Sequence, residues 1–232
     1  MAILPQDQST LGVFETGRLP FADALELQSA AVAARSRGDI GDTLIVTEHD
    51  PVVTAGRATL PDELEQAACL SAFGLKVVPV SRGGRMTYHG PGQLVGYPIV
   101  DLRARNLGLH EYVETLEEAL VDALTQLGLD ARSRAGLRGV WIGDRKTASI
   151  GVAVRRWISY HGFAINVDCD LEVFSAFVPC GIQGVQMTTL ERELGAPVDR
   201  NQLQHLVVEA LRTRLGYDTV CSVPRGAITT GA

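Results

Sequence analysis

The sequence predicts an α+β fold in one continuous domain. Residues 109–127 and 199–215 show long helical periodicity, whereas three strand-like runs follow one another within residues 139–168. Long helices together with clustered hairpin strands are typical of the α+β class. A chain of 232 residues with 46% hydrophobic side chains can bury a substantial core as a single unit.

In the N-terminal half, strand-like and helix-like segments alternate. Pro20 opens the first expected helix, whose apolar face is made of Phe21, Leu25 and Val32. Strands are expected at 10–16 (TLGVFET), 43–49 (TLIVTEH) and 75–80 (LKVVPV), and a second helix at 61–72. These elements precede the two longer helices of the C-terminal half.

The C-terminal half carries the strongest helix signals. One helix is defined by apolar residues at helical spacing, namely Leu109, Val113, Leu116, Leu120, Leu124 and Leu127, with Gly128 as its stop. The other has Asp199 as its N-cap, Gln202 three residues later and Gly216 beyond its end. Between them, GVWIG, KTASIGVAV and SYHGFAINV predict a β meander. We expect one domain over 1–221 and a flexible tail over 222–232, where the sequence becomes small and polar.

Charge and cysteine content exclude several classes of function. A net charge of -6 argues against nucleic-acid binding, since phosphate backbones are held by basic surfaces. No apolar run reaches the length that spans a bilayer and no leader pattern is present, so a cytoplasmic protein without membrane contact is expected. The four cysteines form no CxxC pair, and a metal site built from His49, His89, Asp168 and Cys169 lacks ligand spacing. No metal or cofactor is expected.

Lysine is scarce in this chain. Of 21 basic residues, only Lys76 and Lys146 are lysines. Arginine supplies a permanent cation, whereas lysine can also lose its proton and act as a base. A lysine retained among arginines therefore suggests a role for that proton. A general bias toward arginine explains the same composition, and composition does not separate the two.

A glycine-rich stretch runs from Arg82 to Leu102, RGGRMTYHGPGQLVGYPIVDL. Glycines allow close backbone approach to a ligand and free N–H groups to donate to it. The stretch is equally compatible with a tight hairpin whose glycines serve the turn. It matches neither the phosphate loop GxxxxGK[ST] nor the dinucleotide fingerprint GxGxxG, so nucleotide binding is not indicated.

This stretch closely resembles the signature of the lipoyl(octanoyl) transferases, RGGxxTYHGPGQLVxYPxxDL. The resemblance continues in EHDPVVTAGR (48–57), RKTASIG (145–151), HGFAINVDCDL (161–171) and FVPCGI (177–182). Asp50 and Val53 stand where the family usually has proline and tyrosine, so the family's substrate-pocket details near these two residues carry over less directly to this chain. The resemblance implies a fold similar to biotin and lipoate protein ligases, with a mixed β-sheet flanked by helices.

The resemblance also implies an activity and its residues. Enzymes of this family move an octanoyl group from acyl carrier protein to a lysine of lipoyl domains, in 2-oxoacid dehydrogenase complexes and the glycine cleavage H protein. The nucleophile maps onto Cys180, and the lysine that promotes its ionisation maps onto Lys146. The acyl-binding segments map onto Arg82, Gly83, Gly84, Arg85, Met86, Thr87, Tyr88 and His89, then Ser149, Ile150 and Gly151, then Gly162, Phe163 and Ala164.

The chemistry of the residues agrees with this assignment but also allows different sites and activities. A thiol needs a neighbouring cation or base to attack as thiolate, and Lys146 can supply either. Cys169 is the rival nucleophile, but Asp168 and Asp170 beside it disfavour a thiolate. The competing activities are a Cys–His thioesterase using His89 or His161, an ATP-dependent lipoate ligase and a non-enzymatic acyl-carrier binding module.

Two further expectations concern the oxyanion and the partners. Gly181, which follows the nucleophile, is a candidate donor to the oxyanion. Arginines crowd around Lys146 in sequence, and we expect part of this arginine belt to dock acidic partner proteins. The belt consists of Arg132, Arg134, Arg138, Arg145, Arg155 and Arg156.

Overall fold

The computed structural model of the protein describes residues 8–67, 70–71, 74–182, 184–224 and 226–228. Its strands are β1 (Thr10–Leu19), β2 (Thr43–His49), β3 (Val52–Ala55), β4 (Val77–Pro79), β5 (Met86–His89), β6 (Gln93–Ile99), β7 (Ala131–Arg134), β8 (Leu137–Ile142), β9 (Arg145–Arg155), β10 (Ile158–Asn166), β11 (Gln186–Met187) and β12 (Thr219–Ser222). Its helices are α1 (Phe21–Arg37), α2 (Pro61–Gln66), α3 (Leu109–Gln126), α4 (Leu190–Leu194) and α5 (Arg200–Arg214), with short 3-10 turns η2 (Glu172–Ala176) and η3 (Pro179–Gly181).

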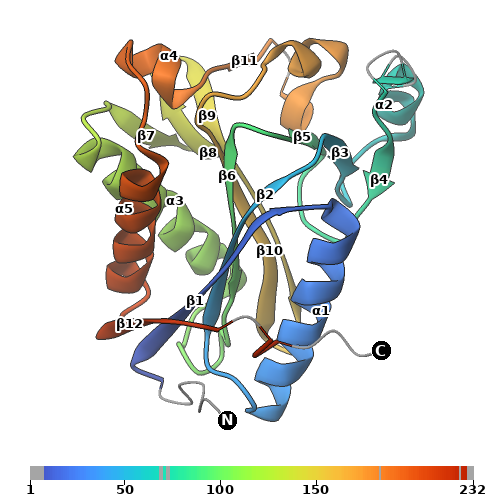
Figure 1. The fold of residues 1–232 in the computed structure, drawn as a ribbon. Coiled ribbons are helices and arrows are strands. Elements are labelled where there is room, and N and C mark those ends of the chain that lie inside the picture. The colour runs from blue at the N-terminus through green and yellow to red at the C-terminus, as the bar shows by residue number, and fades with distance from the viewer. Residues whose placement is uncertain (1–7, 68–69, 72–73, 183, 225, 229–232) are drawn as a thin grey trace.

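A mixed main sheet forms the centre of the molecule (Figure 1). In the described part of the chain its strands run in the order β12-β1-β2-β6-β10-β9-β8-β7, and β11 pairs beside β9. β12 and β2 run parallel to β1, whereas β6, β10, β9 and β8 are joined by antiparallel pairing. The predicted meander is therefore confirmed as β8, β9 and β10.

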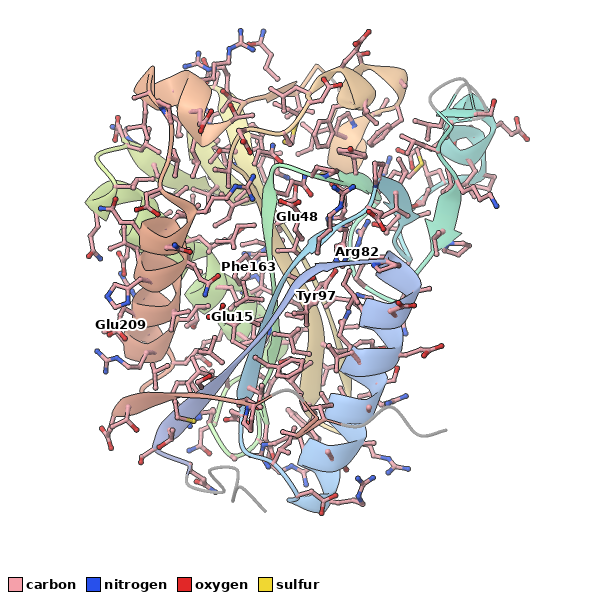
Figure 2. The ribbon with its side chains drawn as sticks, viewed as in Figure 1. Glu15, Glu48, Arg82, Tyr97, Phe163 and Glu209 are labelled. Carbon is pink, nitrogen blue, oxygen red and sulfur yellow. The ribbon has the colours of Figure 1, made fainter. Side chains whose placement is uncertain are left out.

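Helices cover both faces of this sheet (Figure 1). α1 packs on one face, where Ala24, Leu27 and Ala31 join strand residues such as Tyr97 in one apolar cluster. α3 and α5 pack on the other face, where they share a larger cluster with Phe163. Figure 2 shows Tyr97 and Phe163 on these two sides of the sheet. The α+β prediction is thus confirmed, with two separate cores on either side of one sheet.

The two strongest helix predictions agree with the structure, caps included. α3 spans Leu109–Gln126, and the backbone at Gly128 turns left-handed at φ 96° just beyond it. The side chain of Asp199 accepts hydrogen bonds from the N–H groups of Asn201 and Gln202 at the start of α5. Both ends follow from local capping chemistry.

A second, three-stranded sheet was not predicted. Its order is β4-β3-β5, and it packs against the η2 region through a cluster that includes Met86, Tyr88 and Phe174. Residues 86–89, expected in a glycine-rich loop, form strand β5 of this sheet. The glycine-rich loop is therefore limited to the residues just before β5.

Two predicted boundaries differ from the structure. Of the helix expected over 61–72, only Pro61–Gln66 is α-helical, while residues 68–69 and 72 lie outside the described residues. The flexible tail was expected to start at residue 222, yet Ser222 belongs to β12, and Val223 and Ile228 are buried against α1 and its sheet face. Residues 225 and 229–232 of that tail lie outside the described residues.

Candidate active site

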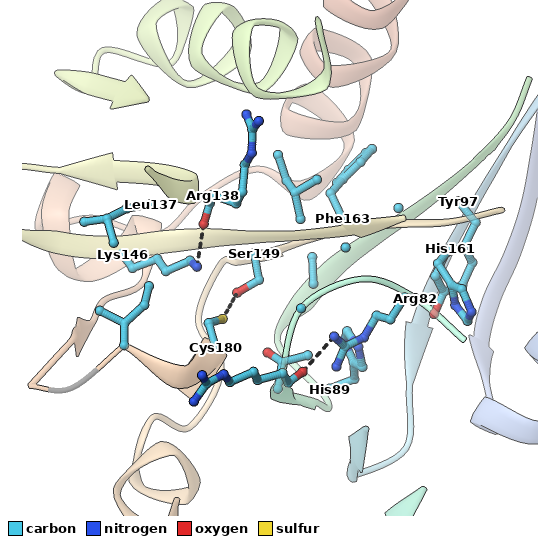
Figure 3. A pocket seen from close by; sticks show the side chains of 18 of the residues that line it. Arg82, His89, Tyr97, Leu137, Arg138, Lys146, Ser149, His161, Phe163 and Cys180 are labelled. Atoms are coloured by element: carbon cyan, nitrogen blue, oxygen red, sulfur yellow. Dashed lines mark hydrogen bonds between the residues drawn. The ribbon is translucent and has the colours of Figure 1, made fainter. Parts of the chain in front are cut away.

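A pocket of about 210 Å³ opens between β9, β10, the loop before β5 and η3. Figure 3 shows Lys146, Ser149 and Cys180 together at one end of it and Tyr97 and His161 at the other. Segments more than 150 residues apart in the chain, from Phe21 to Cys180, contribute to its wall. The fold therefore assembles one pocket from the motifs that the sequence singled out.

Cys180 lies in the short turn η3 at one end of the pocket. It is half-buried, and its backbone adopts the left-handed conformation at φ 56°. Its Sγ lies 3.6 Å from the Ser149 Oγ. The next residue, Gly181, has no room for a side chain, because a Cβ there would come within 2.1 Å of the Arg85 Cδ. Arg85 also lines the pocket and forms an ion pair of 3.0 Å with Glu63 of α2.

Lys146 sits at the start of β9 and is almost entirely buried, with 1% of its surface exposed. Its Nζ donates a hydrogen bond of 2.6 Å to the carbonyl oxygen of Arg138. The same Nζ lies 5.6 Å from the centre of the Trp141 ring, within the range of a cation–π contact. Its ammonium group thus faces the pocket from the β8–β9 wall (Figure 3).

Arg82 anchors the glycine-rich loop to the rest of the site. Its guanidinium donates to the carbonyl oxygens of Gly83, Arg85 and Thr54 and to the Thr54 hydroxyl, at 2.7–3.0 Å. Burial lowers the pKa of this guanidinium, with the pocket-lining Cys180 acting in the opposite direction. The Gly83 N–H donates to the Val152 carbonyl at 2.8 Å, which ties the loop to β9. The loop therefore closes the pocket along the side of β9.

All but three of the predicted site residues line this pocket, the exceptions being Gly83, Met86 and Tyr88. The reason lies in the geometry of β5, where successive side chains point to opposite faces. Thr87 and His89 face the pocket, while Met86 and Tyr88 are buried in the core of the small sheet. Of the segment that forms β5, therefore, only alternate side chains line the cavity.

The end of the pocket away from Cys180 is lined by neutral aromatic and imidazole rings. Burial, followed by the nearby Arg82 charge, lowers the pKa of His161 to about 4. Burial also lowers the pKa of His89 well below its usual value. The His89 ring stacks on Phe21 with centroids 6.0 Å apart. Near neutral pH this end therefore carries no imidazolium charge, which suits an apolar chain.

Comparisons with known proteins agree with this geometry. The family model of the lipoyl protein ligase A/B catalytic domain matches residues 20–212. The chain belongs to this family. Among its relatives are octanoyltransferases from Alkaliphilus metalliredigens, 41% identical over 92% of this chain and 99% of the relative, and from Geobacter sulfurreducens, 40% identical over 93% and 89%. The predicted family and its acyltransferase class are thereby confirmed.

Several solved structures share the fold of this chain at low sequence identity. Lipoate-protein ligase A bound with ATP has a TM-score of 0.70 at 19% identity, covering 95% of this chain and 91% of that chain. A biotin protein ligase from Aquifex aeolicus has a TM-score of 0.52 at 12% identity, covering 88% and 69%. The fold expected from the resemblance, similar to lipoate and biotin ligases, is confirmed.

The rival nucleophile, Cys169, is in an unfavourable environment within this lipoyl protein ligase A/B fold. Burial, followed by the charge of Asp168, raises the pKa of the Cys169 thiol to about 12. The predicted direction is correct, but burial contributes more than the flanking carboxylates. Burial also raises the pKa of Cys221, and Cys69 lies outside the described residues.

A Cys–His pair and an oxyanion donor at Gly181 find little support in the geometry. The His161 Nε2 lies 3.2 Å from the Ser81 Oγ. In the described part of the chain, the hydrogen-bond partner of the Cys180 thiol is Ser149 and not a histidine. The Gly181 N–H, expected as an oxyanion donor, donates to the Val178 carbonyl at 3.2 Å, because η3 turns back on itself.

Among the described residues, no group of three or more His, Cys, Asp or Glu side chains could hold a metal ion, and no helix is long and apolar enough to cross a membrane.

Several pocket residues of this family member were missed in the sequence. They are Phe21, Tyr97, Gly136, Leu137, Arg138 and Ile182. Phe21 and Tyr97 come from α1 and β6, whose patterns indicate only an apolar face and a buried strand. Gly136 lies in the β7–β8 turn and Leu137 and Arg138 begin β8, and the signal available was their position eight to ten residues before Lys146.

The arginine belt is not one surface. Arg132, Arg134, Arg138 and Arg145 form ion pairs with Asp130, Asp144, Glu117 and Glu193, respectively. Arg155 and Arg156 lie at the opposite end of β9 from Lys146. At about 3.3 Å per residue, the nine steps along β9 from Lys146 to Arg155 separate these residues by roughly 30 Å. Of the six arginines, Arg138 alone is among the described residues that line the pocket.

Proposed function

We propose that this chain transfers an octanoyl group from octanoyl-acyl carrier protein to a specific lysine of a lipoyl domain, through a thioester on Cys180. The observation that carries the proposal is the meeting of a half-buried cysteine and a buried lysine at one end of a single pocket (Figure 3). Relatives that are about 40% identical over most of the chain are named octanoyltransferases, which supports the identity of the acyl group.

In the first half-reaction, the Cys180 thiolate attacks the thioester carbonyl of the donor. The bond from that carbonyl carbon to the carrier's sulfur breaks, and the departing thiolate takes up a proton. Lys146 is placed on the pocket wall to favour the thiolate as an ammonium group and to return the proton. One thioester replaces another, so this step needs no ATP.

In the second half-reaction, the amine of the acceptor lysine attacks the Cys180 thioester. An amide bond forms, the carbon–sulfur bond breaks, and the neutral amine form of Lys146 takes the proton that the attacking nitrogen loses. Lysine can perform both proton steps, whereas arginine remains charged throughout. This requirement accounts for a lysine at residue 146 in a chain whose other basic residues are almost all arginine.

The acyl chain would extend from Cys180 along Ser149–Gly151 and Gly162–Ala164 toward the end of the pocket that is lined by aromatic and imidazole rings. Ile150, Phe163 and Phe21 supply apolar wall, and His161 and His89 are neutral there near pH 7. The acceptors we propose are lipoyl domains of 2-oxoacid dehydrogenase complexes and the glycine cleavage H protein. Arginines such as Arg138, which lines the pocket, and Arg145, which precedes Lys146 in β9, would favour association with acidic partners, at a rate that falls with salt.

Intact-mass spectrometry after mixing with octanoyl carrier protein tests the proposal. We expect an adduct of one octanoyl group that is absent from Cys180→Ala and retained in the matched Cys221→Ala variant. An adduct that needs ATP would identify a ligase, and the absence of any adduct would identify a binding module. Either of these results would overturn the proposal.

A further inference from the structure

A single peptide group separates Lys146 from a buried carboxylate on α3. The Lys146 Nζ donates to the carbonyl oxygen of Arg138 at 2.6 Å. The N–H of that same peptide group belongs to Gly139 and donates to the Glu117 Oε1 at 2.7 Å. Ammonium, peptide and carboxylate therefore form one hydrogen-bonded chain from the pocket wall to the helix behind it.

Glu117 is an unusual residue for its position. It is 5% exposed, although it lies on a helix whose neighbouring acid, Glu118, is exposed to solvent. A buried carboxylate is costly unless it is paired and hydrogen-bonded. Its second oxygen accepts from the Arg138 Nη1 at 2.9 Å, so both oxygens have partners. The acid is thus bound to the Arg138–Gly139 segment of β8.

The backbone at Gly139 is shaped to let Lys146 reach this peptide. Gly139 adopts φ 119°, a conformation that side chains rarely allow. A Cβ at Gly139 would lie 2.7 Å from the Lys146 Cε and 2.3 Å from the Ala148 carbonyl oxygen. The aliphatic part of the Lys146 side chain therefore packs against the backbone of Gly139, where no side chain intervenes. Its Nζ donates to the carbonyl oxygen of the same peptide group whose N–H donates to Glu117.

From this geometry we infer that Glu117 is a positioning residue for Lys146, acting through the Arg138–Gly139 peptide. A carboxylate bound to the peptide N–H increases the negative charge on the carbonyl oxygen, which strengthens its hydrogen bond to the ammonium group. Glu117 thereby favours the charged form of Lys146 and holds it at the end of the pocket where Cys180 lies. The catalytic part of this inference rests on the proposed function.

Other charged groups surround Lys146 and must be kept constant in a test. The Arg138 guanidinium points away from the pocket (Figure 3), and its Nη2 lies 2.9 Å from the exposed His110. His110 contacts Glu114 one helical turn later. The loop before β5 contributes Arg82 and Arg85, and η3 contributes Cys180. The ion pair between Arg145 of β9 and Glu193 of α4 is a further charged pair near Lys146 in the chain. Of these groups, only Arg138 loses a charged partner in Glu117→Gln, because its Nη1 pairs with the Glu117 Oε2.

The scarcity of lysine makes a direct measurement possible. Protein labelled with ¹⁵N-lysine contains two Nζ signals, one from Lys146 and one from the exposed Lys76, which serves as an internal reference. In Glu117→Gln we expect the Lys146 signal to move to lower pH than in the wild type, because its hydrogen bond to the Arg138 carbonyl weakens, and the Lys76 signal to stay unchanged. Glu118→Gln removes a neighbouring exposed acid and should leave both signals at their wild-type positions.

Activity provides a second measurement on the same variants. Glu117→Gln is expected to lower kcat for acyl transfer by about tenfold with KM for the carrier unchanged, and to move the pH midpoint of Cys180 alkylation upward. Glu118→Gln should match wild type in both. A purely structural role for Glu117 would alter thermal stability without moving either pH midpoint.

Two results would overturn the inference. The first is that the Lys146 signal titrates at the same pH in Glu117→Gln as in Glu118→Gln, while the wild-type enzyme still forms its Cys180 adduct. A wild-type enzyme that forms no adduct would instead refute the proposed function. If Glu117→Gln does not fold, the wild-type protein supplies the test. The amide proton of Gly139 should then shift with the same pH midpoint as the Lys146 Nζ, and a Gly139 amide insensitive to that titration would contradict the coupling.

Discussion

Replacing Arg82 by methionine should destabilise the fold far more than replacing an ordinary surface arginine. Arg82 is only 8% exposed, and its guanidinium donates to three carbonyl oxygens and one hydroxyl. A buried acceptor left without its donor costs about 1–3 kcal/mol. Two of the four acceptors, both on Thr54, are buried, whereas the Gly83 and Arg85 carbonyl oxygens are partly buried and can regain water. Taking the lower end of that range for the buried acceptors and less for the other two predicts a loss of about 2–3 kcal/mol.

Urea denaturation at pH 7 measures this loss, with Arg57→Met as the matched control. Arg57 is an exposed arginine in the same region of the small sheet, and its replacement should change the free energy of unfolding by less than about 0.5 kcal/mol. An Arg82→Met variant within about 1 kcal/mol of wild type would refute the claim that this guanidinium holds the glycine-rich loop together.

Two further predictions concern titrating groups. Because burial raises the pKa of Cys169 to about 12, iodoacetamide at pH 8 should modify Cys180 and leave Cys169 intact in the folded protein, as peptide mass mapping would show; modification of Cys169 first would contradict this. His161 has a pKa of about 4 when folded against 6.5 in a solvated state, so the unfolded chain binds more protons between these values. The contribution of His161 to stability should therefore be constant above pH 6.5 and fall by about 3 kcal/mol as the pH drops from 6.5 to 4. His161→Gln should flatten this profile in urea titrations at several pH values, and a variant at the exposed His205 should not.

Local patterns explain which elements could be predicted from the sequence. The spacing of Leu116, Leu120 and Leu124 and the caps at Gly128 and Asp199 act within a few residues, so α3 and α5 matched their predictions closely. The small sheet could not be predicted in this way. It pairs β3 with β5 across about thirty intervening residues, and nothing in either strand specifies the partner.

The candidate site shows the same division between local and distant information. Motif resemblance indicated Cys180, Lys146 and most of the pocket wall, but it could not distinguish Thr87 from Met86, since strand alternation decides which one faces the cavity. Glu117 was missed because an acid on a helix usually faces solvent. Its signal was present, as it falls four residues after Val113 and three before Leu120, on the apolar stripe of that helix.

The proposed function depends most on whether the acyl group leaves Cys180 for a lysine without ATP. Acyl-enzyme isolated after reaction with octanoyl carrier protein can be mixed with a lipoyl domain in the absence of nucleotide, and both proteins weighed over time. We predict that the octanoyl mass disappears from the enzyme as it appears on the lipoyl domain, and that a Lys146→Ala enzyme fails to transfer it. An acyl-enzyme that persists beside its acceptor, or a Lys146→Ala enzyme that transfers at the wild-type rate, would contradict the account.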